Sequence, residues 1–244
     1  MGRGVLPTSD RLERMVPLGP HTCRLCLTGG RVVIAKWGSA WEGAVLRVIE
    51  DLGISPRLLT PPRRPQGPRA GGRPWLFLMT EAPGAPPTWS DQPALEGIMS
   101  ALGELHHRTT RPDGSVLCHG DLHRANLLWD GKRATLLDWG NARRGAPLDD
   151  LARIILHPAP DAPGCDLPTG EAAELALALY HQRGPLAHLS WTEFQNQHRE
   201  AAQRLLQQEL ERHNLAASEA PPGVRNWIEI QQEQIQRQLD HLYL

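Results

Sequence analysis

The stretch VLCHGDLHRANLLWDGKRATLLDWG, residues 116–140, decides the fold of this chain. Two apolar runs in it, 127–129 and 134–137, are separated by an Asp-Gly pair. Because Asp-Gly favours a tight reversal between strands, the two runs are predicted to form a β-hairpin. The hairpin brings Asn126, which precedes its first strand, beside Asp138, which follows its second strand.

Polar side chains around this hairpin predict a cation site next to a proton acceptor. Asn126 and Asp138 offer an amide oxygen and a carboxylate, hard ligands of the kind that Mg²⁺ prefers when phosphate groups supply the others. Asp121 lies just upstream in a predicted loop, where its carboxylate can orient or deprotonate a hydroxyl group. The three side chains are therefore expected to converge on one point.

The same residues carry a family resemblance. HGDLHRANLLWD and LLDWGNA resemble the catalytic segment of the aminoglycoside phosphotransferase and choline kinase family, which shares the protein-kinase fold. Asp121 and Asn126 have the D-x4-N spacing of a kinase catalytic loop, and Asp138 stands where D-F-G has its aspartate. GAPLDDLAR resembles the family pattern G-x-P-x-x-D-L-A, which places Asp150 at the family's structural aspartate, and LGELHHR resembles the helix before the catalytic loop.

The resemblance implies roles for these residues. Asp121 would act on the acceptor hydroxyl, while Asn126 and Asp138 would hold Mg²⁺ on the phosphates of ATP or GTP. His119, the histidine of H-G-D, is expected to brace the backbone of the metal site. His123 lies within reach of the same loop and is not needed as a base.

The N-terminal half resembles the family through one lysine and one glutamate. Lys36, one of only two lysines in the chain, ends the run VVIAK and resembles the strand lysine that contacts nucleotide phosphates. Glu42 resembles the helix glutamate that pairs with it. Ser39 and Glu42 also form a capping box, which explains Glu42 without a catalytic role, and Glu50 is an alternative partner for Lys36.

The resemblance also implies a nucleotide-base site. LFLMTEAPG resembles the segment that links the two lobes, with backbone groups near Thr80 and Ala82 hydrogen-bonding the base and Met79 packing behind it. No G-x-G-x-x-G is present, so Gly19 in PLGPHT is the candidate for the turn that covers the phosphates.

The resemblance implies a two-lobed, protein-kinase-like α+β fold, with a nucleotide-binding lobe over 1–82 and a helical catalytic lobe over 83–244. Gly29-Gly30 predicts a hairpin between two strands, and Gly53 is predicted to end the helix that follows. The segment PPRRPQGPRAGGRP, rich in Pro, Gly and Arg, predicts a loop. The remaining expected elements are a helix over 41–52, a loop over 61–74, a strand over 75–84 and helices over 94–110, 149–157, 171–183, 191–213 and 224–243.

Composition excludes several classes of protein. With 244 residues and 40% hydrophobic side chains, the chain can build a core, and its net charge of −1 does not favour a nucleic-acid partner. No run approaches the ~20 apolar residues of a membrane span, and no signal peptide is visible, so a cytoplasmic enzyme with reduced thiols is expected. Cys23 and Cys26 have C-x2-C spacing, which alone does not suffice to predict a zinc site. The oligomeric state is left open.

The acceptor is the least defined part of the prediction. Basic residues outnumber acidic ones over 1–90, and acidic residues outnumber basic ones over 91–244, which favours a cationic acceptor such as an amino sugar or amino alcohol. Arg143 and Arg144 follow Asp138 and could instead face a phosphate, an anionic substrate or solvent.

The sequence therefore predicts a phosphotransferase that moves the γ-phosphoryl group to a hydroxyl of a small molecule. A nucleotide-binding pseudokinase is the first alternative, favoured by the missing glycine-rich loop. A protein kinase is the second, and the lack of an A-P-E signature between Asp138 and Asp150 argues against it.

Overall fold

The structure is a computed structural model that describes residues 10–61, 75–156 and 170–219, together with Gln232. Most of the predicted loop over 61–74 and of the predicted helix over 224–243 lies outside the described residues.

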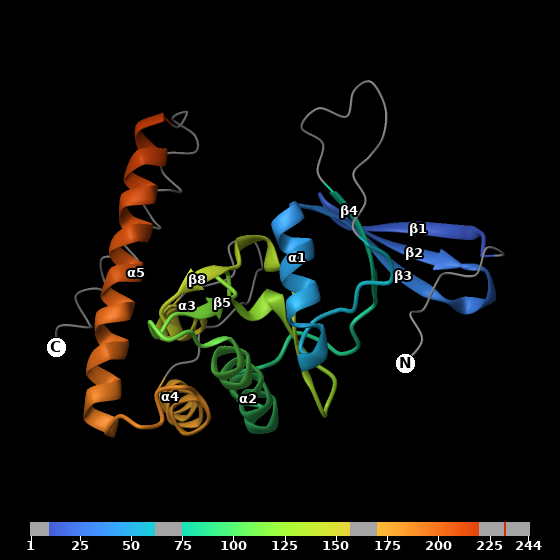
Figure 1. Ribbon diagram of the computed structural model, residues 1–244. Helices are drawn as coiled ribbons and strands as arrows, with labels where there is room; N and C mark the ends of the chain where they lie inside the picture. Colours follow the sequence, from blue (N-terminus) through green and yellow to red (C-terminus); the bar gives the residue numbers. More distant parts are fainter. Residues whose placement is uncertain (1–9, 62–74, 157–169, 220–231, 233–244) are drawn as a thin grey trace.

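A four-stranded antiparallel sheet forms the N-terminal part of the fold (Figure 1). Its strands, in spatial order, are β1 (Leu12–Gly19), β2 (Thr22–Leu27), β3 (Val32–Gly38) and β4 (Trp75–Thr80). The hairpin predicted at Gly29-Gly30 is confirmed: the two residues lie in η1 (Thr28–Gly30) with φ of 78° and 77°, a conformation that glycine adopts without steric cost. Strand β1 was not predicted, because nearly all of its side chains are exposed and its sequence has no regular apolar alternation.

One helix packs against this sheet. α1 (Ala40–Val48) begins at Ser39, whose hydroxyl oxygen accepts a hydrogen bond from the backbone N–H of Glu42 at 3.1 Å. The helix predicted over 41–52 is divided, since α1 is followed by the short η2 (Glu50–Leu52). Gly53, with φ of 65°, ends this segment as predicted.

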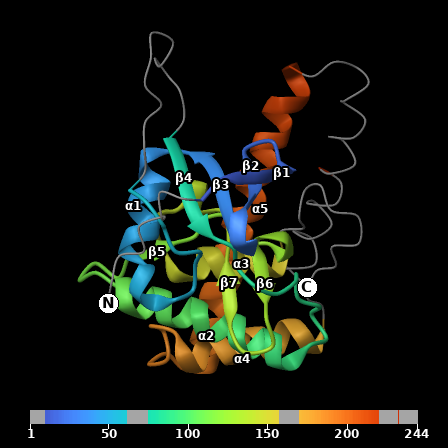
Figure 2. The ribbon, with the colours of Figure 1, turned by 90° about the vertical axis from the view of Figure 1, so that its right-hand side faces the viewer.

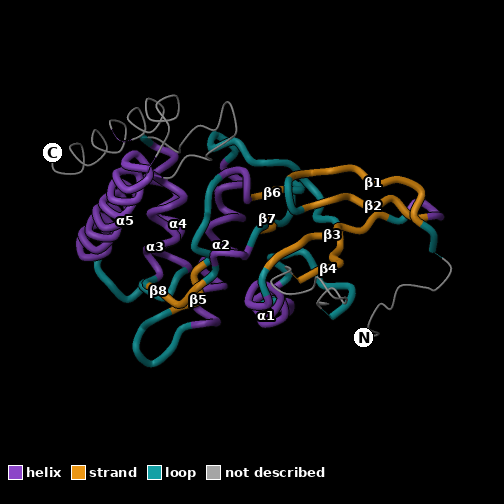
Figure 3. The backbone as a smooth tube through the Cα atoms, turned by 90° about the horizontal axis from the view of Figure 1, so that it is seen from above, coloured by secondary structure: helices purple, strands orange, loops and turns teal. Residues whose placement is uncertain are grey.

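The rest of the described chain is mainly helical, as Figures 2 and 3 show. Its helices are α2 (Gln92–Thr109), α3 (Pro147–Leu156), α4 (Glu171–Arg183) and α5 (Trp191–Glu219), with short turns η3 (Arg124–Asn126) and η4 (Trp139–Asn141). Two small antiparallel pairs join them: β5 (Val116–Cys118) with β8 (Arg143–Gly145), and β6 (Leu127–Trp129) with β7 (Ala134–Leu136). The expected α+β, two-lobed, protein-kinase-like fold is confirmed.

The core of the helical part is organised around α2, which packs against α4 and against the strands β5 and β7. Leu95, Ile98, Leu102 and Leu105 recur at helical spacing on its buried face, each at most 1% exposed. A Cβ at Gly97 would lie 2.3 Å from the Trp129 ring, so only glycine allows this close approach of α2 to β6. This contact fixes the β6–β7 hairpin on the helix.

Within the described parts of the chain, no helix is both long and apolar enough to span a lipid bilayer.

Candidate active site

A cavity of about 400 Å³ lies between the sheet and the β6–β7 hairpin. Ile34, Leu46, Leu128 and Leu137 contribute apolar walls from four different segments. Four of its polar lining residues come from β3, α1, η3 and the segment after β7: Lys36, Glu42, Asn126 and Asp138. The cavity therefore has apolar walls and a charged floor, the combination expected of a small-molecule site.

Lys36 forms the centre of the charged floor. Its Nζ lies 2.5 Å from Glu42 Oε1 and 2.8 Å from Asp138 Oδ1. Burial would lower the pKa of Lys36, but the Glu42 and Asp138 carboxylates outweigh it and raise the pKa. Lys36 therefore stays charged at neutral pH.

Glu42 serves both as a capped helix residue and as an ion-pair partner. Its backbone N–H binds Ser39 Oγ, while its carboxylate, in a side chain only 3% exposed, contacts Lys36 and accepts the backbone N–H of Trp139. Burial raises the pKa of Glu42, and the Lys36 charge opposes that rise. A Cβ at Gly38 would lie 2.1 Å from Glu42 Oε2, so glycine there makes room for the carboxylate. Glu50, the alternative partner, lies exposed in η2.

The hairpin prediction is confirmed in register. Leu127 pairs with Leu136, and the backbone N–H of Leu137 donates to the Asn126 carbonyl at 2.8 Å. Asn126 therefore lies next to the segment that carries Asp138, and both side chains line the cavity.

The donor set suits a hard divalent cation. The amide nitrogen of Asn126 donates to the Asp121 carbonyl at 2.9 Å and lies 3.1 Å from His123 Nε2, so the amide oxygen is the atom available as a ligand. Burial would raise the pKa of Asp138, but the Lys36 charge and hydrogen bond and the Gly140 N–H outweigh it and lower the pKa. An ionised carboxylate and an amide oxygen beside one cavity fit Mg²⁺.

Asp138 also has an unusual backbone. With φ of 62° and ψ of 70°, it is the only non-glycine residue with positive φ among the described residues. Such a conformation costs about 1–3 kcal/mol and persists only where its surroundings enforce it, commonly at functional sites.

Asp121 lies beside the cavity and is not one of its lining residues. Its Oδ2 accepts a hydrogen bond from Asn141 Nδ2 at 3.1 Å, and its backbone carbonyl binds Asn126. Sequence reasoning missed Asn141, although its position three residues after Asp138 in DWGNA was a signal. One carboxylate oxygen of Asp121 is thus oriented by a side chain.

The two loop histidines make local contacts. His119 Nδ1 accepts the Asp121 N–H at 3.4 Å, so Nε2 carries the proton and donates to the Leu137 carbonyl at 2.7 Å. Burial lowers the pKa of His119 and of His123, which keeps both rings neutral at pH 7. His119 therefore links the loop of Asp121 to the residue that precedes Asp138.

The buried carboxylate of Asp150 binds the backbone of the loop that carries His119 and Asp121. Its carboxylate accepts the backbone N–H groups of His119 and Gly120 at 2.6 and 2.8 Å, and lies 3.1 Å from His106 Nε2. The other ring nitrogen of His106 is 2.5 Å from the Tyr180 hydroxyl. The network joins α2, α3 and α4 to the loop that carries Asp121.

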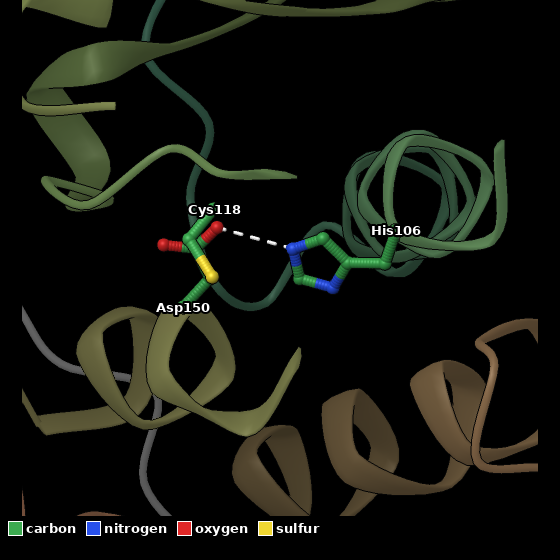
Figure 4. A group of neighbouring side chains, drawn as sticks. All are labelled: His106, Cys118 and Asp150. Carbon is green, nitrogen blue, oxygen red and sulfur yellow. Dashed lines mark hydrogen bonds and ion pairs between the residues drawn. The ribbon is translucent and has the colours of Figure 1, made fainter. Parts of the chain in front are cut away.

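Cys118 lies beside this network, as Figure 4 shows. One ligand-type atom each from His106, Cys118 and Asp150 lie within 4.8 Å of one another, as in a metal site. The Asp150 carboxylate already accepts the backbone N–H groups of His119 and Gly120, however, and burial raises the pKa of the Cys118 thiol. The thiol donates to the Ala146 carbonyl at 3.3 Å, so we interpret the three side chains as parts of a hydrogen-bonded network.

The arrangement of Cys23 and Cys26 does not favour a shared metal ion either. Both lie within strand β2, three residues apart, and side chains at that spacing point to opposite faces of a sheet.

The segment proposed to bind the nucleotide base lies at the cavity. Met79, Thr80 and Ala82 all line it, and Met79 is 5% exposed. The N–H of Thr80 donates to the Arg57 carbonyl at 2.9 Å and is therefore already used. Hydrogen bonding to a base is left to the Thr80 carbonyl and to the backbone around Ala82.

The sequence model of the phosphotransferase enzyme family matches residues 43–186. No curated protein matches the chain. Among solved structures, a choline/ethanolamine kinase family protein from Mesorhizobium loti is similar at 14% identity and a TM-score of 0.64, covering 94% of this chain and 87% of that one. An aminoglycoside phosphotransferase from Alicyclobacillus acidocaldarius has 13% identity, a TM-score of 0.56 and coverages of 95% and 92%. A macrolide 2'-phosphotransferase from Brachybacterium faecium is similar at 16% identity and a TM-score of 0.56, covering 88% of this chain and 89% of that one.

Proposed function

Because the chain belongs to the phosphotransferase enzyme family, we propose that it transfers the γ-phosphoryl group of ATP or GTP to a hydroxyl group of a small molecule. The contact of Lys36 with both Glu42 and Asp138, inside a cavity also lined by Asn126, is the observation that carries the proposal. It supports a role for Lys36 in binding phosphate and for Asp138 and Asn126 in binding a cation beside it.

The nucleotide would enter with its base against Met79. The Thr80 carbonyl and the backbone at Ala82 would recognise the base, and Lys36 would contact the phosphates. Leu18 and Thr22 flank the β1–β2 turn and also line the cavity, so this turn can cover the phosphates without a glycine-rich loop. That position favours an active enzyme over a pseudokinase.

Asn126 and Asp138 are the residues that would hold Mg²⁺. When bound, the ion would neutralise charge on the phosphate oxygens. Asp138 keeps its carboxylate ionised beside Lys36, and Asn126 directs its amide nitrogen away to Asp121 and His123, so that its oxygen is the ligand.

Asp121 would orient and deprotonate the acceptor. Because Asn141 binds Oδ2, Oδ1 is the oxygen that takes the hydroxyl proton. The acceptor oxygen then forms a bond to the γ-phosphorus, the bond from that phosphorus to the bridging oxygen breaks, and its electron pair leaves with the nucleoside diphosphate. The rate enhancement comes mainly from positioning and electrostatic stabilisation.

We further propose that the nucleotide-binding lobe comprises residues 1–82 and the catalytic lobe residues 83–244. The cavity lined by Lys36 and Asp138 would then lie between the lobes. Because a nucleoside triphosphate is the donor, we place the reaction in the cytoplasm.

Transfer of radiolabel tests this proposal. Wild-type protein with Mg²⁺ and a panel of hydroxyl compounds should move label to an acceptor from [γ-³²P]ATP or [γ-³²P]GTP and not from the α-labelled nucleotides. Nucleotide binding without transfer to any compound would instead indicate a nucleotide-binding pseudokinase.

A further inference from the structure

A second cavity, of about 310 Å³, lies where β8 and the start of α3 meet α5. Figure 1 shows these elements together on the helical side of the fold. Its charged lining residues are Arg143, Asp149, Arg153 and Arg204, and Gln208 adds a polar amide. Such a volume suits a small ligand, and arginines dominate the charge.

The cavity adjoins the loop that carries Asp121. A Cβ built on Gly120 would lie 2.7 Å from Arg143 Nη1, so this guanidinium lies directly beside the residue before Asp121. Asn141, two residues before Arg143, donates to the Asp121 carboxylate. A ligand bound by Arg143 therefore lies next to the proposed acceptor position.

The charges at the cavity favour an anion. Three guanidinium groups face one lining carboxylate, that of Asp149. Glu209, close by, is 3.6 Å from Arg153 Nη1 and also pairs with Arg212, so its charge is already matched.

Arg153 has a buried hydrogen-bond donor that an anionic oxygen could satisfy. Its side chain is only 12% exposed, and its Nε is buried with no hydrogen-bond acceptor among the described residues. An unsatisfied buried N–H is unfavourable, and an anionic oxygen would satisfy it. Arg144, in contrast, already donates to the Thr109 carbonyl at 2.6 Å.

We propose that Arg143, Arg153 and Arg204 bind an anionic group, a carboxylate or a phosphate, of the molecule whose hydroxyl is phosphorylated. Guanidinium groups bind both kinds of anion through paired hydrogen bonds. The inference rests on the proposed function, because it assigns the acceptor hydroxyl to Asp121.

This inference replaces the cationic acceptor expected from the acidic balance of residues 91–244. Charges further from a ligand than the screening length, about 8 Å at physiological ionic strength, contribute little to its binding. Three of the four charged residues that line the cavity are arginines, so the local charge favours an anion.

Binding without nucleotide tests the anion site on its own. Calorimetry would compare glycerol 3-phosphate and gluconate with neutral glycerol and cationic choline, all of which carry hydroxyl groups. Wild-type protein should bind one or both anions and neither of the other probes. Binding of glycerol 3-phosphate alone would identify a phosphate site, and binding of gluconate alone would identify a carboxylate site. Either result supports the anion site.

Arg204→Gln is the decisive variant, because Arg204 is exposed on α5 and its replacement should leave the fold intact. Its anion affinity should fall roughly tenfold, the effect of about 1.4 kcal/mol. Arg199→Gln is the matched control, an exposed arginine on the same helix outside the cavity, and should bind like wild type.

The outcomes separate the two proposals. No anion binding, equal affinities in Arg204→Gln and wild type, or label transfer to choline but to neither anion would overturn the anionic acceptor and leave the proposed function standing. Anion binding with no label transfer to any hydroxyl compound would overturn the proposed function and, with it, the assignment of the anion to an acceptor.

Discussion

Lys36 Nζ lies 2.8 Å from Asp138 Oδ1, although the two residues are 102 positions apart in the sequence. The contact joins strand β3 of the sheet to the segment after the β6–β7 hairpin. It also matches the pKa directions of the two groups, since that of Lys36 is raised and that of Asp138 is lowered. Both side chains therefore remain charged at the place where a nucleoside triphosphate would bind.

Replacing Lys36 by alanine should lower the affinity for ATP far more than the affinity for adenosine, because adenosine has no phosphate for the ammonium to contact. Loss of a charge-assisted hydrogen bond, about 1.5–3 kcal/mol, corresponds to a reduction in ATP affinity of roughly tenfold or more. Calorimetric titration of both ligands measures this. Lys132→Ala, which removes the only other lysine, is the control, and equal losses for ATP and adenosine would contradict the phosphate contact.

Glu42→Gln should lower ATP affinity by more than about twofold if Glu42 orients Lys36, because glutamine removes the negative charge at the 2.5 Å contact. The Ser39 cap uses the backbone N–H of Glu42 and is unchanged in this variant.

Ser39→Ala supplies the complementary measurement. It should lower the free energy of unfolding by about 0.5–2 kcal/mol, as loss of an N-cap does, with little change in ATP affinity. An ATP affinity within twofold of wild type in Glu42→Gln would reduce Glu42 to a structural residue.

Asp138→Ala should abolish the Mg²⁺ dependence of ATP binding, whereas Asn126→Ala should reduce it. Asp138 supplies a full negative charge, and Asn126 supplies one neutral amide oxygen. Titrating ATP with and without Mg²⁺ against both variants and wild type distinguishes these effects. Mg²⁺-independent affinities that are the same in all three proteins would show that neither residue holds the ion.

The stability of the protein should fall as the pH drops from about 6.5 to about 4. Burial in α5 lowers the pKa of His198 from 6.5 to about 4, so over this range the unfolded chain binds a proton that the folded chain excludes. The associated stability is complete above pH 6.5 and is lost as the pH falls, by about 3 kcal/mol in total.

His198→Leu tests this contribution through urea unfolding at several pH values. The variant should show a shallower loss of unfolding free energy between pH 6.5 and pH 4 than wild type. The same pH slope in both proteins would show that His198 does not titrate differently in the folded and unfolded states.

Local signals explain why the hairpin at the site could be predicted. Asp130-Gly131 lies between two apolar runs, and Gly131 adopts φ of 90°, which a glycine accommodates readily. The neighbouring Asp130 carboxylate accepts the backbone N–H groups of Lys132 and Arg133 at 2.8 and 2.7 Å. Because the turn is stabilised by its own residues, the approach of Asn126 to Asp138 followed from short-range sequence.

Other features depend on contacts that no local pattern encodes. Asp150 meets His106 across 44 residues, and His106 meets Tyr180 across 74, through packing of separate helices. The arginine cavity is likewise assembled from β8, α3 and α5, so Arg143 alone could not be distinguished from a solvent-exposed residue. The positive charge of this cavity was therefore beyond sequence reasoning, whereas the approach of Asn126 to Asp138 and of Glu42 to Lys36 was expected.

The central claim is tested most directly by comparing phosphoryl transfer and ATP binding in Asp121→Asn and wild type. Radiolabel transfer from [γ-³²P]ATP to the accepted hydroxyl compound should fall roughly 10²- to 10⁴-fold, the usual contribution of a general base. The Kd for ATP should stay within about twofold, because Asp121 lies outside the cavity lining. Transfer by Asp121→Asn at the wild-type rate would contradict the account.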